Sequence, residues 1–146
     1  MVTIKDEIED FKTQCKRYIY CKKKKIECEY KLEEIGVQIL GVKSPTLDGV
    51  YVVHDLHKDR RNELFHIESQ IIEEKEDCIR NNKKVDSILG MLNKRDEKLI
   101  KDLYVYKKNH EMIAEKYHFG TRKSMYYHVD RVLERILTQC EQKKVI

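Results

Sequence analysis

The sequence predicts an all-α fold, a long antiparallel helical hairpin followed by a small three-helix helix-turn-helix domain. Charged residues make up 38% of the 146 residues and hydrophobic residues 40%, with one proline and five glycines. Such dense charge, with so few residues that interrupt a helix, is typical of long solvated helices rather than of a sheet. Apolar residues also recur at spacings of three and four, which place them on one helical face. We divide the chain into the hairpin, 1–91, and the second domain, 92–146.

The first expected helix runs from Thr3 to about Leu40, a stretch without proline. Its apolar stripe begins with Ile4, Ile8, Phe11, Cys15 and Tyr18. Beyond Ile19 the stripe continues with Ile26, Tyr30, Val37 and Leu40. The lysines at 22–25 break the repeat between these two sets, so a strict coiled coil over the whole length is not expected.

A turn is expected at 41–54, GVKSPTLDGVYVVH, which contains Gly41, a Ser44-Pro45 step and an Asp48-Gly49 turn. The second helix then runs from about Asp55 to Leu89. Its apolar face comprises Leu64, Ile67, Ile71, Cys78, Val85 and Ile88. The apolar cluster at 50–53 either folds onto the helix ends or docks a partner protein.

Charges on the two helices favour an antiparallel pairing in which facing residue numbers sum to about 95. The lysines at 22–25 then face acids between 73 and 77, Glu33 and Glu34 face Arg60 and Arg61, and acids at 6–10 face Lys83 and Lys84. Each exposed pair contributes only about 0.2–1 kcal/mol, so the charges select the register more than they hold the helices together. Because two helices bury little surface, we expect a second copy, or another protein, to cover the exposed apolar surface, and we favour a homodimer.

The composition favours a cytoplasmic protein. No apolar run approaches the roughly 18 residues of a membrane span. The N-terminal MVTIKDEIEDF carries acids where a signal peptide needs basic and then apolar residues. Without a CxxC pair, the cysteines are expected to be reduced thiols that pack in the interior: Cys15, Cys21, Cys28, Cys78 and Cys140.

The sequence predicts neither an enzyme nor a cofactor. It has no glycine-rich phosphate loop, and no carboxylate pair or Ser/His/Asp arrangement stands at a recognisable catalytic spacing. A zinc site is not predicted either, because its possible ligands are spaced irregularly along one helix: His54, His57, His66 and Cys78.

Basic charge is concentrated in the C-terminal third of the chain. Residues 1–92 carry 17 Lys and Arg against 18 Asp and Glu, a net charge of −1, whereas residues 93–146 carry 13 against 8, a net charge of +5. Such an excess attracts a polyanion. The KKKK run at 22–25 is not counted as a nucleic-acid site, because acids in the second helix are expected to pair with it.

Two short helices are expected at the start of this basic segment. Asn93, with Asp96 three residues later, caps a helix that ends near Tyr106. Asn109 caps a second helix of about two turns, HEMIAEKY. The side chains expected to point inward from it are Met112, Ile113 and Tyr117.

A third helix is expected from Arg122, after Gly120 at positive φ and Thr121 as its cap. Its buried stripe comprises Met125, Val129, Val132, Leu133 and Ile136. Its outer face presents Lys123, Tyr126, Tyr127, Asp130 and Arg131. For Tyr126, packing at the edge of the core is an equal alternative. Two short helices, a tight turn and a longer helix with a basic, aromatic face are the parts of a helix-turn-helix.

Residues 92–137, LNKRDEKLIKDLYVYKKNHEMIAEKYHFGTRKSMYYHVDRVLERIL, resemble the fourth conserved region of bacterial housekeeping sigma factors, which reads the −35 promoter element. The matching features are the leading LNKRDEKLIKDLY, IAEKY in the second helix, the Thr-Arg opening of the third helix and its RVLERIL ending. With its long helical N-terminal part, the whole chain is similar to small phage-encoded sigma-like regulators of the ArpU and RinA kind, which control late phage genes.

The resemblance implies five DNA-reading positions, which are Arg122, Lys123, Ser124, Tyr126 and Tyr127, and a Thr121 at the helix start that can touch phosphate. The chain departs from the family pattern at several of them. An acid is usual in place of Lys123, arginines are usual in place of Ser124 and Tyr126, and the turn YHFGT is one residue longer. A preference for −35 sequences therefore does not transfer.

Side-chain chemistry also favours DNA contact. Arg122 or Lys123 can donate to guanine O6 and N7, a tyrosine ring can pack on a thymine methyl, and Arg131 can reach the backbone. The start of the second helix suits a phosphate, through Lys107, Lys108, Asn109 and His110. We expect a sequence-specific DNA-binding regulator of phage or prophage transcription. The alternatives are a small terminase subunit that marks DNA for packaging, a protein-only RNA polymerase adaptor, and a helical bundle without a nucleic-acid partner.

Overall fold

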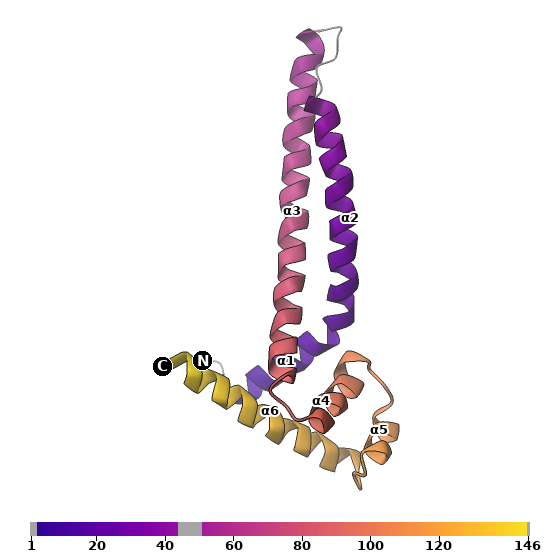
Figure 1. Ribbon diagram of the computed structural model, residues 1–146, viewed down its shortest axis with the longest axis vertical. Coiled ribbons are helices and arrows are strands. Elements are labelled where there is room, and N and C mark those ends of the chain that lie inside the picture. The colour runs from indigo at the N-terminus through magenta and orange to yellow at the C-terminus, as the bar shows by residue number, and fades with distance from the viewer. Residues whose placement is uncertain (1–2, 44–50, 146) are drawn as a thin grey trace. The chain divides into compact units, whose positions relative to one another are not determined.

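A computed structural model describes the backbone at residues 3–43 and 51–145, and the side chains at 3–41 and 59–142. Every regular element in these ranges is a helix, which confirms the all-α prediction. The elements, labelled in Figure 1, are α1 (Ile4–Lys16), α2 (Tyr18–Lys43), α3 (Tyr51–Leu89), α4 (Lys94–Ile100), the π-helix η1 (Lys101–Val105), α5 (His110–Lys116) and α6 (Arg122–Val145).

The helices form two compact units, the terminal unit (1–21 with 80–146) and the hairpin unit (22–79). This division differs from the expected boundary between 91 and 92. The reason is that α1 and the end of α3 share one apolar core with the C-terminal helices. Core residues from the N-terminal side are Ile8, Phe11, Cys15, Val85, Ile88 and Leu89. Those from the C-terminal side include Leu99, Leu103, Ile113, Met125 and Leu133.

The single helix expected from Thr3 to Leu40 is interrupted at Arg17, so that part of the prediction is wrong. Two amides from α3 satisfy backbone carbonyls on either side of the interruption. Asn81 Nδ2 donates to the carbonyl oxygen of Gln14 at 3.1 Å, and Asn82 Nδ2 donates to that of Tyr18 at 3.2 Å. Because carbonyls beside a helix break need partners, these amides make the interruption stable.

In the hairpin unit, α2 and α3 lie side by side and run in opposite directions (Figure 1). Their shared core comprises Cys28, Ile35, Ile39, Leu64 and Ile71, with Leu32 and Ile67 partly buried against it. The predicted face of α3 is therefore correct in this unit. The predicted face of α2 is wrong, because its expected stripe of Ile26, Tyr30, Val37 and Leu40 is exposed. Two apolar stripes run along α2, and α3 packs on the stripe of Cys28, Ile35 and Ile39.

Ion pairs between α2 and α3 agree only in part with the predicted pairing. Lys24 Nζ lies 3.6 Å from Glu74 Oε2, as expected. Lys75 Nζ also lies 3.5 Å from Glu29 Oε1, a pair that was not expected. Arg60 was expected to face an acid on α2, but its Nη1 contacts Glu63 of its own helix at 3.0 Å. Because the side of α2 with Cys28 and Ile35 is buried against α3, this side determines which charged residues of the two helices face each other.

The turn expected at 41–54 is shorter than predicted, since α2 extends to Lys43 and α3 begins at Tyr51. Residues 44–50, and the side chains of the expected docking cluster at 50–53, lie outside the described part of the chain. Among the described helices, none combines the length and apolarity that a membrane crossing requires. The described side chains also include no cluster of three or more His, Cys, Asp or Glu residues arranged to hold a metal ion.

Candidate nucleic-acid interface

The first helix of the C-terminal segment is capped as predicted. Asn93 Oδ1 accepts from the backbone N–H of Asp96 at 2.8 Å, and Asn93 Nδ2 lies 3.1 Å from Asp96 Oδ2. The Asp96 carboxylate is buried, and its Oδ1 lies 2.9 Å from Nε2 of His128 on α6. A cap at the start of α4 is thereby tied to the second turn of α6.

This first helix continues as the π-helix η1 and ends at Tyr106, as predicted. Lys107 follows with a φ of 53°. The buried Asp102 of η1 accepts hydrogen bonds from Tyr117 Oη at 2.9 Å and Lys116 Nζ at 3.4 Å, and Lys108 Nζ lies 3.1 Å away. Burial alone raises the pKa of Asp102, but the hydrogen bonds from Lys108 and Tyr117 and the nearby positive charges outweigh it, and the net pKa is lowered.

Asn109 caps α5 as expected, because its Oδ1 accepts from the backbone N–H groups of Glu111 at 2.9 Å and Met112 at 3.3 Å. Ile113 and Tyr117 are buried, as predicted. Met112 was expected to point inward, yet 67% of it is exposed. Ile113, Ala114 and Tyr117 form the buried side of this short helix. Met112, one residue earlier, projects away from that side into solvent.

The turn between α5 and α6 uses His118, and not Gly120, as its left-handed residue. His118 has a φ of 64°, and no described glycine has a positive φ. The N–H of His118 donates to Glu115 O at 3.1 Å, and that of Phe119 donates to Ala114 O at 2.8 Å. These two bonds are the Schellman pattern that closes a helix C-terminus. The expectation for Gly120 is wrong because α5 ends at Lys116, which places the left-handed closing residue at His118, two residues before Gly120.

Helix α6 begins as predicted, with Thr121 Oγ1 accepting from the N–H of Ser124 at 3.0 Å. The predicted buried stripe is confirmed at all of its positions, which are Met125, Val129, Val132, Leu133 and Ile136. The stripe packs into the core of the terminal unit, so the opposite side of the first turns of α6 faces outward.

Lys123, Tyr127 and Arg131 lie on this outward side, as predicted. Tyr127 is 66% exposed, and the Arg131 guanidinium lies 5.6 Å from the centre of its ring, a cation–π arrangement. Tyr126 is half-buried instead, and its hydroxyl hydrogen-bonds with Nδ1 of His110 at the start of α5. The Tyr126 ring therefore serves packing between α5 and α6.

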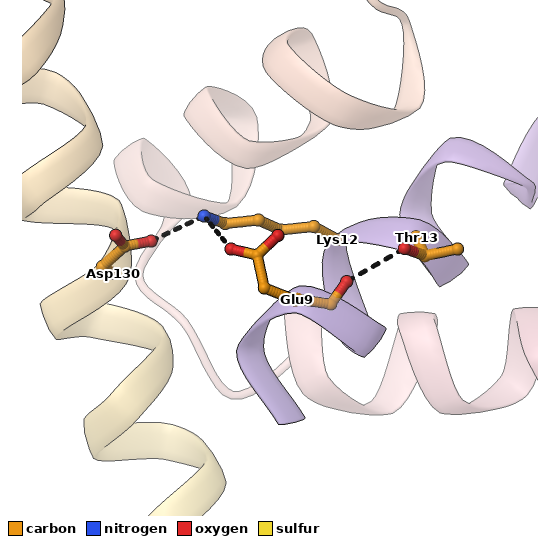
Figure 2. Close-up of polar contacts among 4 residues, drawn as sticks. All are labelled: Glu9, Lys12, Thr13 and Asp130. Atoms are coloured by element: carbon orange, nitrogen blue, oxygen red, sulfur yellow. Dashed lines mark hydrogen bonds and ion pairs between the residues drawn. The ribbon is translucent and has the colours of Figure 1, made fainter. Parts of the chain in front are cut away.

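Asp130 was also expected on the outer face, but it faces α1. Figure 2 shows Lys12 of α1 reaching Asp130, with Nζ to Oδ1 at 2.7 Å, while Glu9 Oε1 lies 3.4 Å from the same nitrogen. Burial lowers the pKa of Lys12, but the hydrogen bond to Asp130 and the surrounding charges outweigh it, and the net pKa is raised. The contact could not be read from the sequence, since 118 residues separate the partners.

We call the exposed side chains of the first turns of α6 the basic face. Lys123, Tyr127 and Arg131 lie opposite the buried stripe, and Arg122 and Ser124 belong to the exposed first turn. Arg122 Nη2 lies 3.8 Å from the exposed Glu111 Oε1. Thr121, Lys107, Lys108 and Asn109 are exposed as well, whereas His110 is half-buried.

Arg135 extends the basic face and was missed by sequence reasoning. It lines a hollow beside α4 together with Asn93, Asp96, His128, Arg131 and Val132. The signal was present in the sequence, because Arg135 follows Arg131 by four residues and so lies one turn further along the same side.

Comparison of the chain with protein-family models, with curated proteins and with solved structures gives no match. The likeness to region four of sigma factors therefore stays a prediction that depends on the residues quoted for it.

Proposed function

We propose that the terminal unit binds double-stranded DNA, with α6 entering the major groove, and that the chain is a sequence-specific transcription regulator of the phage sigma-like kind. The observation that carries the proposal is the basic face. Lys123, Tyr127 and Arg131 stand exposed on the side of α6 opposite its buried stripe, and Arg122 and Ser124 are exposed in its first turn. A helix presented in this way fits the width of the major groove.

Base reading is assigned to the first turn of α6. Arg122 and Lys123 are exposed there and can donate to guanine O6 and N7. The weak contact of Arg122 with Glu111, at 3.8 Å between exposed groups, is easily exchanged for a base edge. Tyr127, one turn further on, offers its ring to a thymine methyl, while Arg131 is placed to reach the backbone.

Phosphate contact is assigned to the loop between η1 and α5. Lys107 and Lys108 are both exposed there. Lys108 also pairs with the buried Asp102, so part of its charge is already neutralised within the protein. Lys107 is therefore the stronger of the two candidates for a phosphate.

The basic face is held by polar contacts from three other elements. Lys12 of α1 binds Asp130, Asp96 of α4 binds His128, and His110 at the start of α5 binds Tyr126. All three contacts reach α6 within its first three turns. A helix fixed in this way loses little conformational freedom on binding, which favours specific recognition.

The experiment selects binding sites from a random DNA pool with the full-length chain and then measures affinity by fluorescence anisotropy. Replacing Arg122 by Ala is expected to cost about 1–3 kcal/mol on the selected site and to relax base preference at one position. Replacing Lys107 by Ala should weaken binding to all sequences alike and reduce the salt dependence.

The matched control removes the same charge elsewhere in the terminal unit, by replacing the exposed Lys83 with Ala. This variant should bind like the parent chain. Equal losses of DNA affinity for Lys83→Ala and Arg122→Ala would mean that the chain attracts DNA only by its general charge. Absence of any salt-dependent binding would reject DNA as the partner and favour a protein-only adaptor.

A further inference from the structure

Helix α2 carries an apolar stripe on the side turned away from its contact with α3. The exposed fractions are 51% for Ile26, 70% for Tyr30 and 66% for Val37, while Ile19 at the start of the helix is 37% exposed. The core contact with α3 uses a different stripe, Cys28, Ile35 and Ile39. Large apolar side chains aligned on a solvent-facing side mark a surface that a partner covers.

The stripe has the spacing of a coiled-coil seam once two charged residues are included in it. The positions 19, 23, 26, 30, 33, 37 and 40 are separated alternately by four and three residues, the spacing of heptad positions a and d. Lys23 and Glu33 are both exposed and are the only charged residues among these positions. They stand symmetrically about residue 28, five positions before and five after it.

We propose that this side of α2 binds α2 of a second copy of the chain in antiparallel orientation. The two-fold axis crosses the seam at the level of residue 28 along the helix. Each a position then meets a d position of the second copy. Ile26 meets Tyr30 and Lys23 meets Glu33, and the symmetry repeats each pair.

Charge decides the orientation. In the antiparallel arrangement both lysines are paired with glutamates of the other copy. In a parallel, in-register arrangement Lys23 would meet Lys23 and Glu33 would meet Glu33, two like-charge contacts within an apolar seam. Charged residues at single seam positions are a known means of selecting register and orientation, and the apolar layers on either side supply the attraction.

The test uses the full-length chain without DNA and measures its mass by light scattering over a wide range of concentration. The parent chain is expected to form a dimer. Lys23→Glu alone, or Glu33→Lys alone, places two like-charge pairs in the seam and should raise the dimer dissociation constant at least about tenfold. The double variant Lys23→Glu/Glu33→Lys restores both pairs and should dimerise like the parent.

Two further measurements test whether positions 23 and 33 carry the effect. An equimolar mixture of the two single variants should form a heterodimer, because position 23 of each copy then faces an opposite charge at position 33 of the other. Lys25→Glu is the matched control, since it makes the same charge change on the same helix at an exposed position outside the seam. It should dimerise like the parent chain.

A monomer at all concentrations would overturn the proposal. A closed ring of many copies, or a dimer that withstands both single variants, would overturn it as well. Circular dichroism on every variant establishes that the helices are intact, and the result is independent of whether the chain binds DNA.

Discussion

His118 ends α5 in a left-handed conformation, with a φ of 64°, two residues before the glycine that the sequence offers for that role. A side chain in this region costs roughly 1–2 kcal/mol relative to a right-handed conformation. The backbone bonds to Glu115 and Ala114 hold the turn nonetheless. The position therefore stores a small strain just before the basic face of α6.

Replacing His118 by Gly should stabilise the protein by about 0.5–1 kcal/mol, since the relief of strain exceeds the added entropy of the unfolded chain. Gly120→Ala is the control. A Cβ at Gly120 has no neighbour within 4 Å and the residue has no positive φ, so this variant should be unchanged or slightly more stable. Urea unfolding measures both. A marked loss of stability in Gly120→Ala would place the left-handed residue at 120 instead.

An ion pair between Lys12 and Asp130 joins α1 to α6 next to an apolar contact. The Lys12 side chain is 12% exposed, and its nitrogen lies 2.7 Å from Asp130. The raised pKa of Lys12 means that the folded state favours the charged lysine. This contribution to stability is present below the unfolded pKa of about 10.4 and is lost as the pH rises through the folded pKa.

Asp130→Asn should lower the free energy of unfolding by about 1–3 kcal/mol at neutral pH, because it leaves a largely buried lysine charge without its carboxylate. Lys12→Met should change it by less than about 1 kcal/mol, because an apolar side chain of similar length replaces the pair. Glu9→Gln is the control, since Glu9 contacts the same nitrogen from an exposed position. Urea unfolding followed by circular dichroism separates the three, and equal losses for Asp130→Asn and Glu9→Gln would contradict the assignment.

The core of the terminal unit is built from residues near both ends of the chain. Phe11 is 1% exposed and belongs to the same cluster as Leu103, Met125 and Leu133. The basic face therefore depends on a helix at the N-terminus, and not only on the segment from 92 onward. The segment from 92 onward therefore lacks part of its core when it is separated from α1.

Phe11→Ala should lower the stability of the terminal unit by about 3–5 kcal/mol, as expected for an aromatic ring removed from a core. A fragment of residues 92–146 alone should lack a cooperative thermal transition, because the partners from α1 and α3 are missing. Thermal melting followed by circular dichroism tests both. Ile72→Ala, at an exposed position of the hairpin unit outside the proposed seam, should leave the terminal unit unchanged. A fragment that melts cooperatively would contradict the shared core.

Local features of the terminal unit were predictable from the sequence. Asn93, Asn109 and Thr121 cap helices as expected, because a cap bonds to backbone only two or three residues away. The buried stripe of α6 was predictable for a similar reason, since helical periodicity alone brings its members together. Among the proposed contact residues, those of the first turn of α6 are exposed as expected.

Pattern and composition were enough to establish that the chain is helical, where most helices begin, and that α6 has an apolar side and a basic side. Long-range packing was needed to establish which stripe of α2 is buried, that α1 joins the C-terminal core, and that Tyr126 and Asp130 turn toward the protein. The physical reason is that periodicity defines the faces of a helix, whereas the choice between two apolar faces depends on the surface packed against it. In this chain that surface comes from residues far away in the sequence.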